Sequence, residues 1–124
     1  LLKCSNMLFM ISIYRVISSE ILHNMAALKL CYAIIKNEIV LKTEIQTLLV
    51  CLLKLQDETV IKQTDSEQEA LYKLRCRIIS CKIAKELYVR GIKSDIVDGW
   101  KRISENKNEF IEIRNVVFDT TGDE

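Results

Sequence analysis

Apolar residues recur at steps of three and four along most of the chain, which is the period of an α-helix. The stretch 66–90 has the longest uninterrupted helical pattern. Ser66 and Glu69 form a capping box at its start, in which each side chain satisfies a free backbone N–H. Gly91 follows its end, where a left-handed residue commonly closes a helix. The pattern therefore predicts a helix over 66–90.

Three helices are expected before this one. Residues 1–17 are apolar on almost every side, which is typical of a helix buried all round. A buried strand is the alternative for that stretch. A second helix is predicted over 20–37, capped by one of two serines. A third is predicted over 39–56, where the most regular amphipathic row of the chain is formed by Leu41, Ile45, Leu48, Leu52 and Leu55. The polar residues 57–65 predict a loop.

Two shorter helices are expected after Gly91. Ser94 can cap a helix over 94–105, whose apolar residues include Trp100. We expect Trp100 to be buried against the long helix, and Gly99 to allow a close approach between helices. A capping-box pattern at Asn106 and Glu109 predicts a last helix over 107–118. The run 111–118 could instead be a strand, although no second strand is available nearby to pair with it.

Composition agrees with an all-α protein. Of the 124 residues, 49% are hydrophobic, three are glycine and none is proline. Such a length indicates one domain over 1–124, or part of one. Because the chain starts with Leu inside an apolar pattern, we expect it to be the C-terminal fragment of a larger helical protein. The apolar run 7–17 is too short to span a bilayer and contains Arg15, so no membrane association is expected.

The helices fall into three successive pairs, 1–17 with 20–37, 39–56 with 66–90, and 94–105 with 107–118. Short connections make consecutive helices antiparallel neighbours. The first two pairs begin about 40 residues apart, a spacing within the period of two-helix repeats. In this layout the chain resembles HEAT and armadillo repeats. The resemblance implies antiparallel hairpins in the C-terminal part of an α-solenoid; a self-contained bundle of five or six helices is the alternative, and a mixed α/β fold a weaker third.

Candidate catalytic chemistry is sparse. The five cysteines lie at 4, 31, 51, 76 and 81, without a CxxC or a similar metal-binding spacing. They indicate reduced thiols in an intracellular compartment, either cytoplasmic or nuclear. His23 is the only histidine, and the three glycines stand too far apart to form a phosphate-binding loop. We therefore expect no enzyme activity, no catalytic residue, no metal and no cofactor.

Charge is unevenly distributed, although the formal net charge is only +1. Between 70 and 93 seven basic residues stand against one acidic residue, whereas acidic residues predominate after 94. The four basic residues predicted to bind a partner are Lys73, Arg75, Arg77 and Lys82, because they lie farthest in sequence from the acidic end. The alternative is a solvated face that pairs with the acidic C-terminal helices.

Two function classes follow from these observations. The first is a non-catalytic scaffold or protein-interaction segment of a helical-repeat protein, bound to another protein or to a preceding part of the same polypeptide. The second is a nucleic-acid-binding helical module, or an accessory subunit of an enzyme that modifies RNA or DNA, which uses the basic helix 66–90. An exposed aromatic row that could stack bases is missing from that helix, which favours a protein partner.

Overall fold

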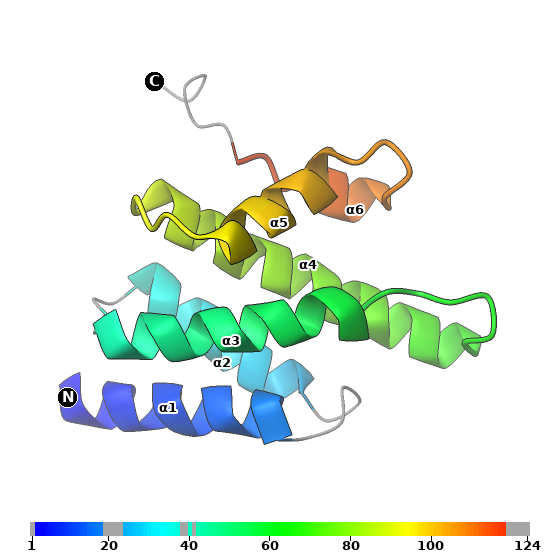
Figure 1. Ribbon diagram of the computed structural model, residues 1–124. Coiled ribbons are helices and arrows are strands. Elements are labelled where there is room, and N and C mark those ends of the chain that lie inside the picture. Colours follow the sequence, from blue (N-terminus) through cyan, green and yellow to red (C-terminus); the bar gives the residue numbers. More distant parts are fainter. Residues whose placement is uncertain (1, 19–23, 38–39, 41, 119–124) are drawn as a thin grey trace.

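The computed structural model describes residues 2–18, 24–37, 40 and 42–118, and within these ranges it is all-helical, without a strand. Its helices, shown in Figure 1, are α1 (Leu2–Ser18), α2 (Met25–Asn37), α3 (Lys42–Glu58), α4 (Glu67–Val89), α5 (Asp95–Glu105) and α6 (Ile111–Arg114). The all-α prediction is confirmed. The predicted strand alternatives for 1–17 and 111–118 are wrong.

The helices are stacked as successive antiparallel pairs. In Figure 1, α1, α3 and α5 run in the same direction, and α2 and α4 run back. α1 packs against α2 and α3, whereas α4 packs against α2, α3, α5 and α6. Contacts therefore join each hairpin to the next one along the chain, and α4 is the helix that most of the others touch.

The core is one continuous cluster of side chains from every helix. Its largest fully buried members include Phe9, Ile13, Leu28, Leu48 and Trp100. In the amphipathic row predicted for the third helix, Leu48, Leu52 and Leu55 are buried and Ile45 is half-buried, while Leu41 lies outside the described residues. The period of three and four therefore identified the buried side of α3 correctly.

Both ends of α4 follow the capping pattern of the sequence. At its start, Ser66 Oγ accepts a hydrogen bond from Glu69 N at 3.1 Å. The Glu69 carboxylate accepts from the Ser66 hydroxyl at 3.3 Å, instead of from the Ser66 backbone N–H as a full capping box requires. At its end, Gly91 has φ +80°, Gly91 N donates to Tyr88 O and Ile92 N donates to Leu87 O. These two bonds form a Schellman motif, which explains the position of Gly91.

The helix α5 is anchored by Trp100, as predicted. Ser94 Oγ accepts from Ile96 N at 3.2 Å and so caps the helix. Trp100 is completely buried, and its Nε1 donates to Leu52 O of α3 at 3.1 Å. A Cβ atom on Gly99 would lie 2.7 Å from Gln56 Nε2, so the glycine allows α5 to approach α3 closely.

The last helix is much shorter than predicted. The sequence pattern predicts a helix over 107–118, but α6 covers only Ile111–Arg114. Asn106 Oδ1 accepts from Asn108 N in a turn, and Glu109 joins a buried ion pair instead of capping a helix. Beyond α6, Val116 and Phe118 are buried while Val117 is exposed. This alternation suits an extended segment, so tertiary contacts override the helical pattern here.

The described chain covers the first helix on one side only, so the cover expected on its other sides is not supplied by these residues. Phe9, Ile13 and Val16 face the core, but other apolar side chains of α1 are exposed. The end of α1 is held by Lys54 of α3, whose Nζ donates to Val16 O at 2.8 Å and to Ile17 O at 2.5 Å. A cation at these carbonyls satisfies the C-terminal end of the helix dipole. The capping serine proposed at Ser19 lies outside the described residues, and Ser18 ends α1.

Candidate functional site

Lys73, the first of the four predicted basic residues, has its ammonium group paired within the chain. Its Nζ lies 2.7 Å from Asp65 Oδ2 and donates to Val60 O at 3.2 Å. Asp65 also accepts from Lys62 N at 2.8 Å. The Lys62 N–H and the Lys73 ammonium together hold the pKa of the Asp65 carboxyl below its ordinary value. Lys73 therefore fastens the 59–65 loop to α4, which contradicts the expectation that its charge is left free for a partner.

Arg77 is buried in a polar network below the surface. Its Nη2 and Nε donate to Glu109 Oε2 at 3.1 and 3.3 Å, and its Nη1 donates to Gln56 O at 3.1 Å and Thr59 Oγ1 at 3.0 Å. The guanidinium also lies over the Trp100 ring, 5.6 Å from its centroid. The expectation of an exposed, internally unpaired Arg77 is therefore wrong. Glu109 lies far from Arg77 in the sequence, but the fold brings the two side chains together.

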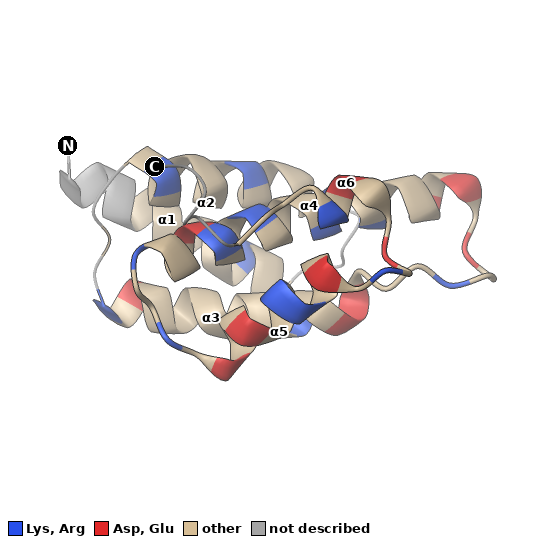
Figure 2. Cartoon of the chain, turned by 90° about the horizontal axis from the view of Figure 1, so that it is seen from above, with Lys and Arg blue, Asp and Glu red and all other residues tan. Residues whose placement is uncertain are grey.

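Arg75 and Lys82 are exposed, so the structure leaves these two of the four predicted side chains at the surface. Figure 2 shows how Lys and Arg follow α4, while acidic residues are frequent on α5. Lys82 also lines a shallow pocket of about 250 Å³ between α2, α4 and the segment after α6. We call it the lysine pocket; its lining residues are Tyr32, Lys36, Lys82, Lys85, Glu86, Asn115 and Val116.

The lysine pocket brings together residues that the sequence did not connect. Lys82 and Lys85 lie one turn apart on α4, and Lys36 comes from the neighbouring α2. Lys36 Nζ lies 5.6 Å from the centroid of the Tyr32 ring, a cation–π contact within α2. Of the residues in this lining, only Lys82 was predicted to bind a partner, because the charge run is visible along the sequence of α4 whereas the contribution of α2 depends on packing.

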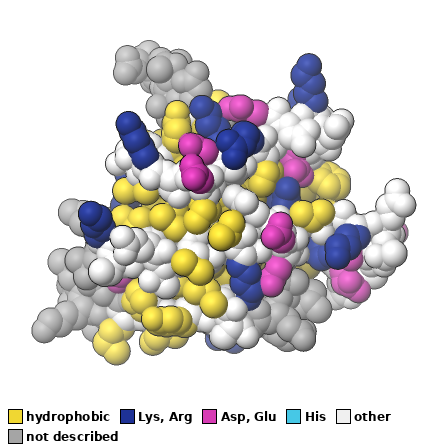
Figure 3. Space-filling view, in the orientation of Figure 1, with side chains coloured by type: hydrophobic (Ala, Val, Ile, Leu, Met, Phe, Trp, Pro, Cys, Tyr) yellow, Lys and Arg dark blue, Asp and Glu magenta, His cyan; other side chains and the backbone are white. Residues whose placement is uncertain are grey.

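An apolar face on the first and third helices is left uncovered by the described chain. We define it by six exposed side chains, namely Met7, Leu8, Ile11 and Tyr14 of α1 and Val50 and Leu53 of α3. Their exposed fractions range from 49% for Leu8 to 64% for Met7. Figure 3 shows hydrophobic side chains gathered over α1 and α3 on the face of the molecule in view.

The apolar face was predicted in part. The apolar character of the first helix indicated a surface that something else must cover, but the exposed residues of α3 were not anticipated. Leu53 stands beside the amphipathic row of that helix in the sequence, yet its side chain is 51% exposed. Its position next to the row at 48, 52 and 55 was the only signal, and that signal pointed toward burial.

The described cysteines have the environment of structural residues. Cys31, Cys51, Cys76 and Cys81 are free thiols and all four are buried. Burial raises the pKa of each thiol to about 12, so the reactive thiolate is scarce at neutral pH. Within the described ranges, no three His, Cys, Asp or Glu side chains come together as a metal site. His23 lies outside these ranges.

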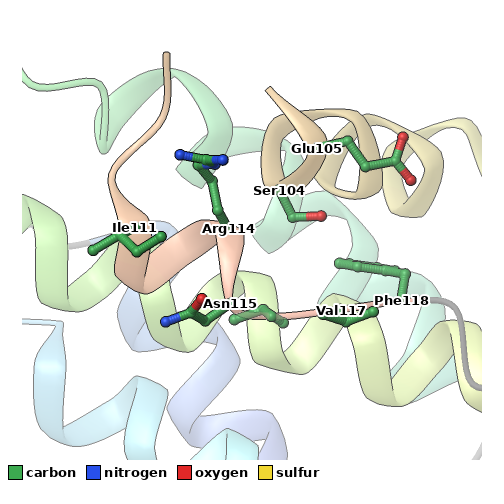
Figure 4. A pocket seen from close by; sticks show the side chains of 8 residues that line it. Ser104, Glu105, Ile111, Arg114, Asn115, Val117 and Phe118 are labelled. Carbon is green, nitrogen blue, oxygen red and sulfur yellow. The ribbon is translucent and has the colours of Figure 1, made fainter. Parts of the chain in front are cut away.

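A second shallow pocket, of about 320 Å³, lies between α5, α6 and the segment that follows α6 (Figure 4). Ile111 and Val117 line it together with Arg114, and all three are exposed. Ser104 is the buried polar residue of the lining, and its hydroxyl donates to Lys101 O at 2.8 Å. In Figure 4 the carboxylate of Glu105 points away from Arg114. The pocket thus lacks a set of convergent polar groups.

The geometry defines an all-helical protein built from stacked hairpins, with an apolar face and a basic pocket on its surface. Comparison with protein-family models, with curated proteins and with solved structures finds no match to the chain. None of the helices in the described ranges combines the length and the apolar character that crossing a membrane requires.

Proposed function

We propose that the chain is a non-catalytic protein-interaction segment of a helical-repeat scaffold, and that it binds another protein through the apolar face. The observation that carries this proposal is the exposure of six large apolar side chains on two adjacent helices, α1 and α3. A contiguous apolar surface loses its unfavourable contact with water when a partner covers it. Tyr14 adds a side chain with an apolar body and a polar tip, a type enriched in protein interfaces.

The stacking of the hairpins supports a scaffold of the HEAT or armadillo type. In such solenoids each hairpin contacts mainly its neighbours, and the aligned helices form an extended binding surface. Here α1 packs against α3 and α3 against α5, so that the first helices of the three hairpins form one row. The buried free thiols fit an intracellular compartment, cytoplasmic or nuclear, in which cysteines stay reduced.

Nucleic-acid binding through α4 is the second candidate. The exposed side chains of Arg75 and Lys82 favour this function. Lys73 and Arg77, however, form ion pairs with Asp65 and Glu109. Affinity for a nucleic-acid backbone grows with the number of phosphates that cations neutralise. Two of the four side chains on which this function depended are already engaged, so we place it behind protein binding.

Photo-crosslinking tests the proposed function. A photo-reactive phenylalanine analogue is placed at Ile11 or Leu53 in the apolar face, and at Leu71 as a control, in cells that express the chain. Leu71 is also apolar and is 48% exposed, but it lies in the first turns of α4. We expect positions 11 and 53 to give the same discrete protein adduct and position 71 to give none. Equal labelling at all three positions, or nucleic acid as the main adduct, would contradict the proposal.

A further inference from the structure

The lysine pocket concentrates positive charge that the described chain does not neutralise. Lys36 and Lys82 are exposed and Lys85 is half-buried. Among the described residues, no carboxylate oxygen lies within 4.0 Å of any of these three ammonium groups. Glu86 is the single acidic residue of the lining, so the pocket carries two net positive charges. A solvated charge run would place its lysines along one helix, whereas these lysines come from two helices and surround one pocket.

The size and the charge of the pocket indicate what it can hold. At about 250 Å³ it is smaller than the roughly 300–1,000 Å³ typical of whole-ligand pockets, so it suits one chemical group of a larger molecule. A phosphate monoester carries about −1.5 to −2 charges at pH 7, which matches the pocket. A phosphodiester or a carboxylate carries only one negative charge. Lysine also donates three hydrogen bonds, which suits the several oxygens of a phosphate.

We infer that the lysine pocket binds the phosphate monoester of a phosphorylated serine or threonine in a protein partner. Lys36, Lys82 and Lys85 would surround the phosphate oxygens, and the Asn115 amide lies in the same lining to donate a further hydrogen bond. Tyr32 and Val116 provide an apolar wall for the short aliphatic stem of the phosphorylated residue. This site is separate from the apolar face, and it can exist whether or not that face binds a protein.

The test is a titration of the whole chain, followed by amide NMR, with three capped pentapeptides that share the sequence Ala-Ala-X-Ala-Ala. X is phosphoserine, serine or glutamate. We expect the phosphoserine peptide to shift the amides of Tyr32, Lys36, Lys82, Lys85 and Asn115. The serine peptide should shift none of them, and the glutamate peptide should bind at least about fivefold more weakly, because its carboxylate carries one charge and fewer acceptor oxygens.

Lysine substitutions locate the site. Lys36→Ala and Lys82→Ala should each weaken binding of the phosphoserine peptide about tenfold, the effect of one lost charge-assisted hydrogen bond. Lys29→Ala is the matched control, since Lys29 is exposed on α2 two turns before Lys36 and outside the pocket lining. It should change the affinity less than twofold. Unchanged amide spectra outside the pocket confirm that each variant is folded.

Three results would overturn the inference. The first is that serine and phosphoserine peptides shift the same amides to the same extent. The second is that Lys36→Ala and Lys29→Ala weaken binding equally, which would reduce the effect to general surface charge. The third is that a short oligothymidylate without terminal phosphates binds through the same lysines more tightly than the phosphopeptide. That outcome would identify a phosphodiester site and hence a nucleic-acid partner.

Discussion

α1 and α4 depart from the usual distribution of residues in opposite directions. α1 exposes Met7 and Ile11 to solvent by more than half, whereas α4 buries Arg77 and Ser80 in the core. The buried polar groups have partners within the chain, since Arg77 contacts Glu109 and Ser80 Oγ donates to Cys76 O at 2.7 Å. The exposed apolar groups of α1 have no such compensation. The buried polar groups of α4 are therefore satisfied within the described chain, whereas the described chain leaves the outer face of α1 uncovered.

The largest loss of stability is expected from substitution of Trp100, which is completely buried in the core. Trp100→Ala should lower the free energy of unfolding by about 3–5 kcal/mol, because it leaves a cavity and removes the hydrogen bond to Leu52 O. Urea unfolding followed by circular dichroism measures this loss. Trp100→Phe should cost less, since it retains most of the ring volume. A loss below about 1 kcal/mol for the alanine variant would show that the core beside α4 is not well packed.

The next effect is expected at Arg77. Arg77→Ala should cost about 3 kcal/mol, because it leaves the largely buried Glu109 carboxylate without its cation. Adding Glu109→Gln to that variant should restore part of the lost stability, since the uncompensated charge is removed. Lys82→Ala on the same helix is the control and should stay within about 0.5 kcal/mol of the parent, as exposed positions usually do. Equal stability of the Arg77 and Lys82 variants would contradict the polar network.

A smaller effect concerns the pH dependence of the loop before α4. The pKa of Asp65 in the folded chain is below its ordinary value of 3.8, first because of the Lys62 N–H and then because of Lys73. A lowered folded pKa stabilises the fold above pH 3.8, and that contribution disappears as pH falls through the folded pKa. Lys73→Met should raise the Asp65 pKa part of the way toward 3.8, as measured by carboxyl carbon NMR. No change would mean that the ion pair is absent in solution.

The sequence was a good guide where one local signal decided the structure. Ser66, Gly91 and Ser94 marked helix ends correctly because capping depends on neighbouring residues. Burial of Trp100 followed from its place on a short amphipathic helix. The long helix predicted over 107–118 failed because Glu109 forms a distant ion pair that no local pattern reveals.

The candidate site was less predictable, for the same physical reason. Lys73 and Arg77 belong to the most basic stretch of the sequence, and only folding brings Asp65 and Glu109 to them. Conversely, Lys36 is an ordinary exposed residue of α2 until packing places it beside Lys82. The apolar face lies between these cases, because the sequence showed the excess of apolar residues in α1 but not the contribution of Val50 and Leu53.

The role of the apolar face as an interaction surface is tested most directly by the mass of the purified chain as a function of concentration. Analytical ultracentrifugation should show self-association of the parent chain, because without a partner the apolar faces cover one another. Ile11→Glu combined with Leu53→Glu should give a monomer, and its free energy of unfolding should lie within about 0.5 kcal/mol per substituted site of the parent's value. Leu71→Glu is the control and should associate like the parent. This role of the apolar face is contradicted if the parent chain stays monomeric at every concentration. It is also contradicted if Leu71→Glu abolishes self-association as fully as the double substitution does.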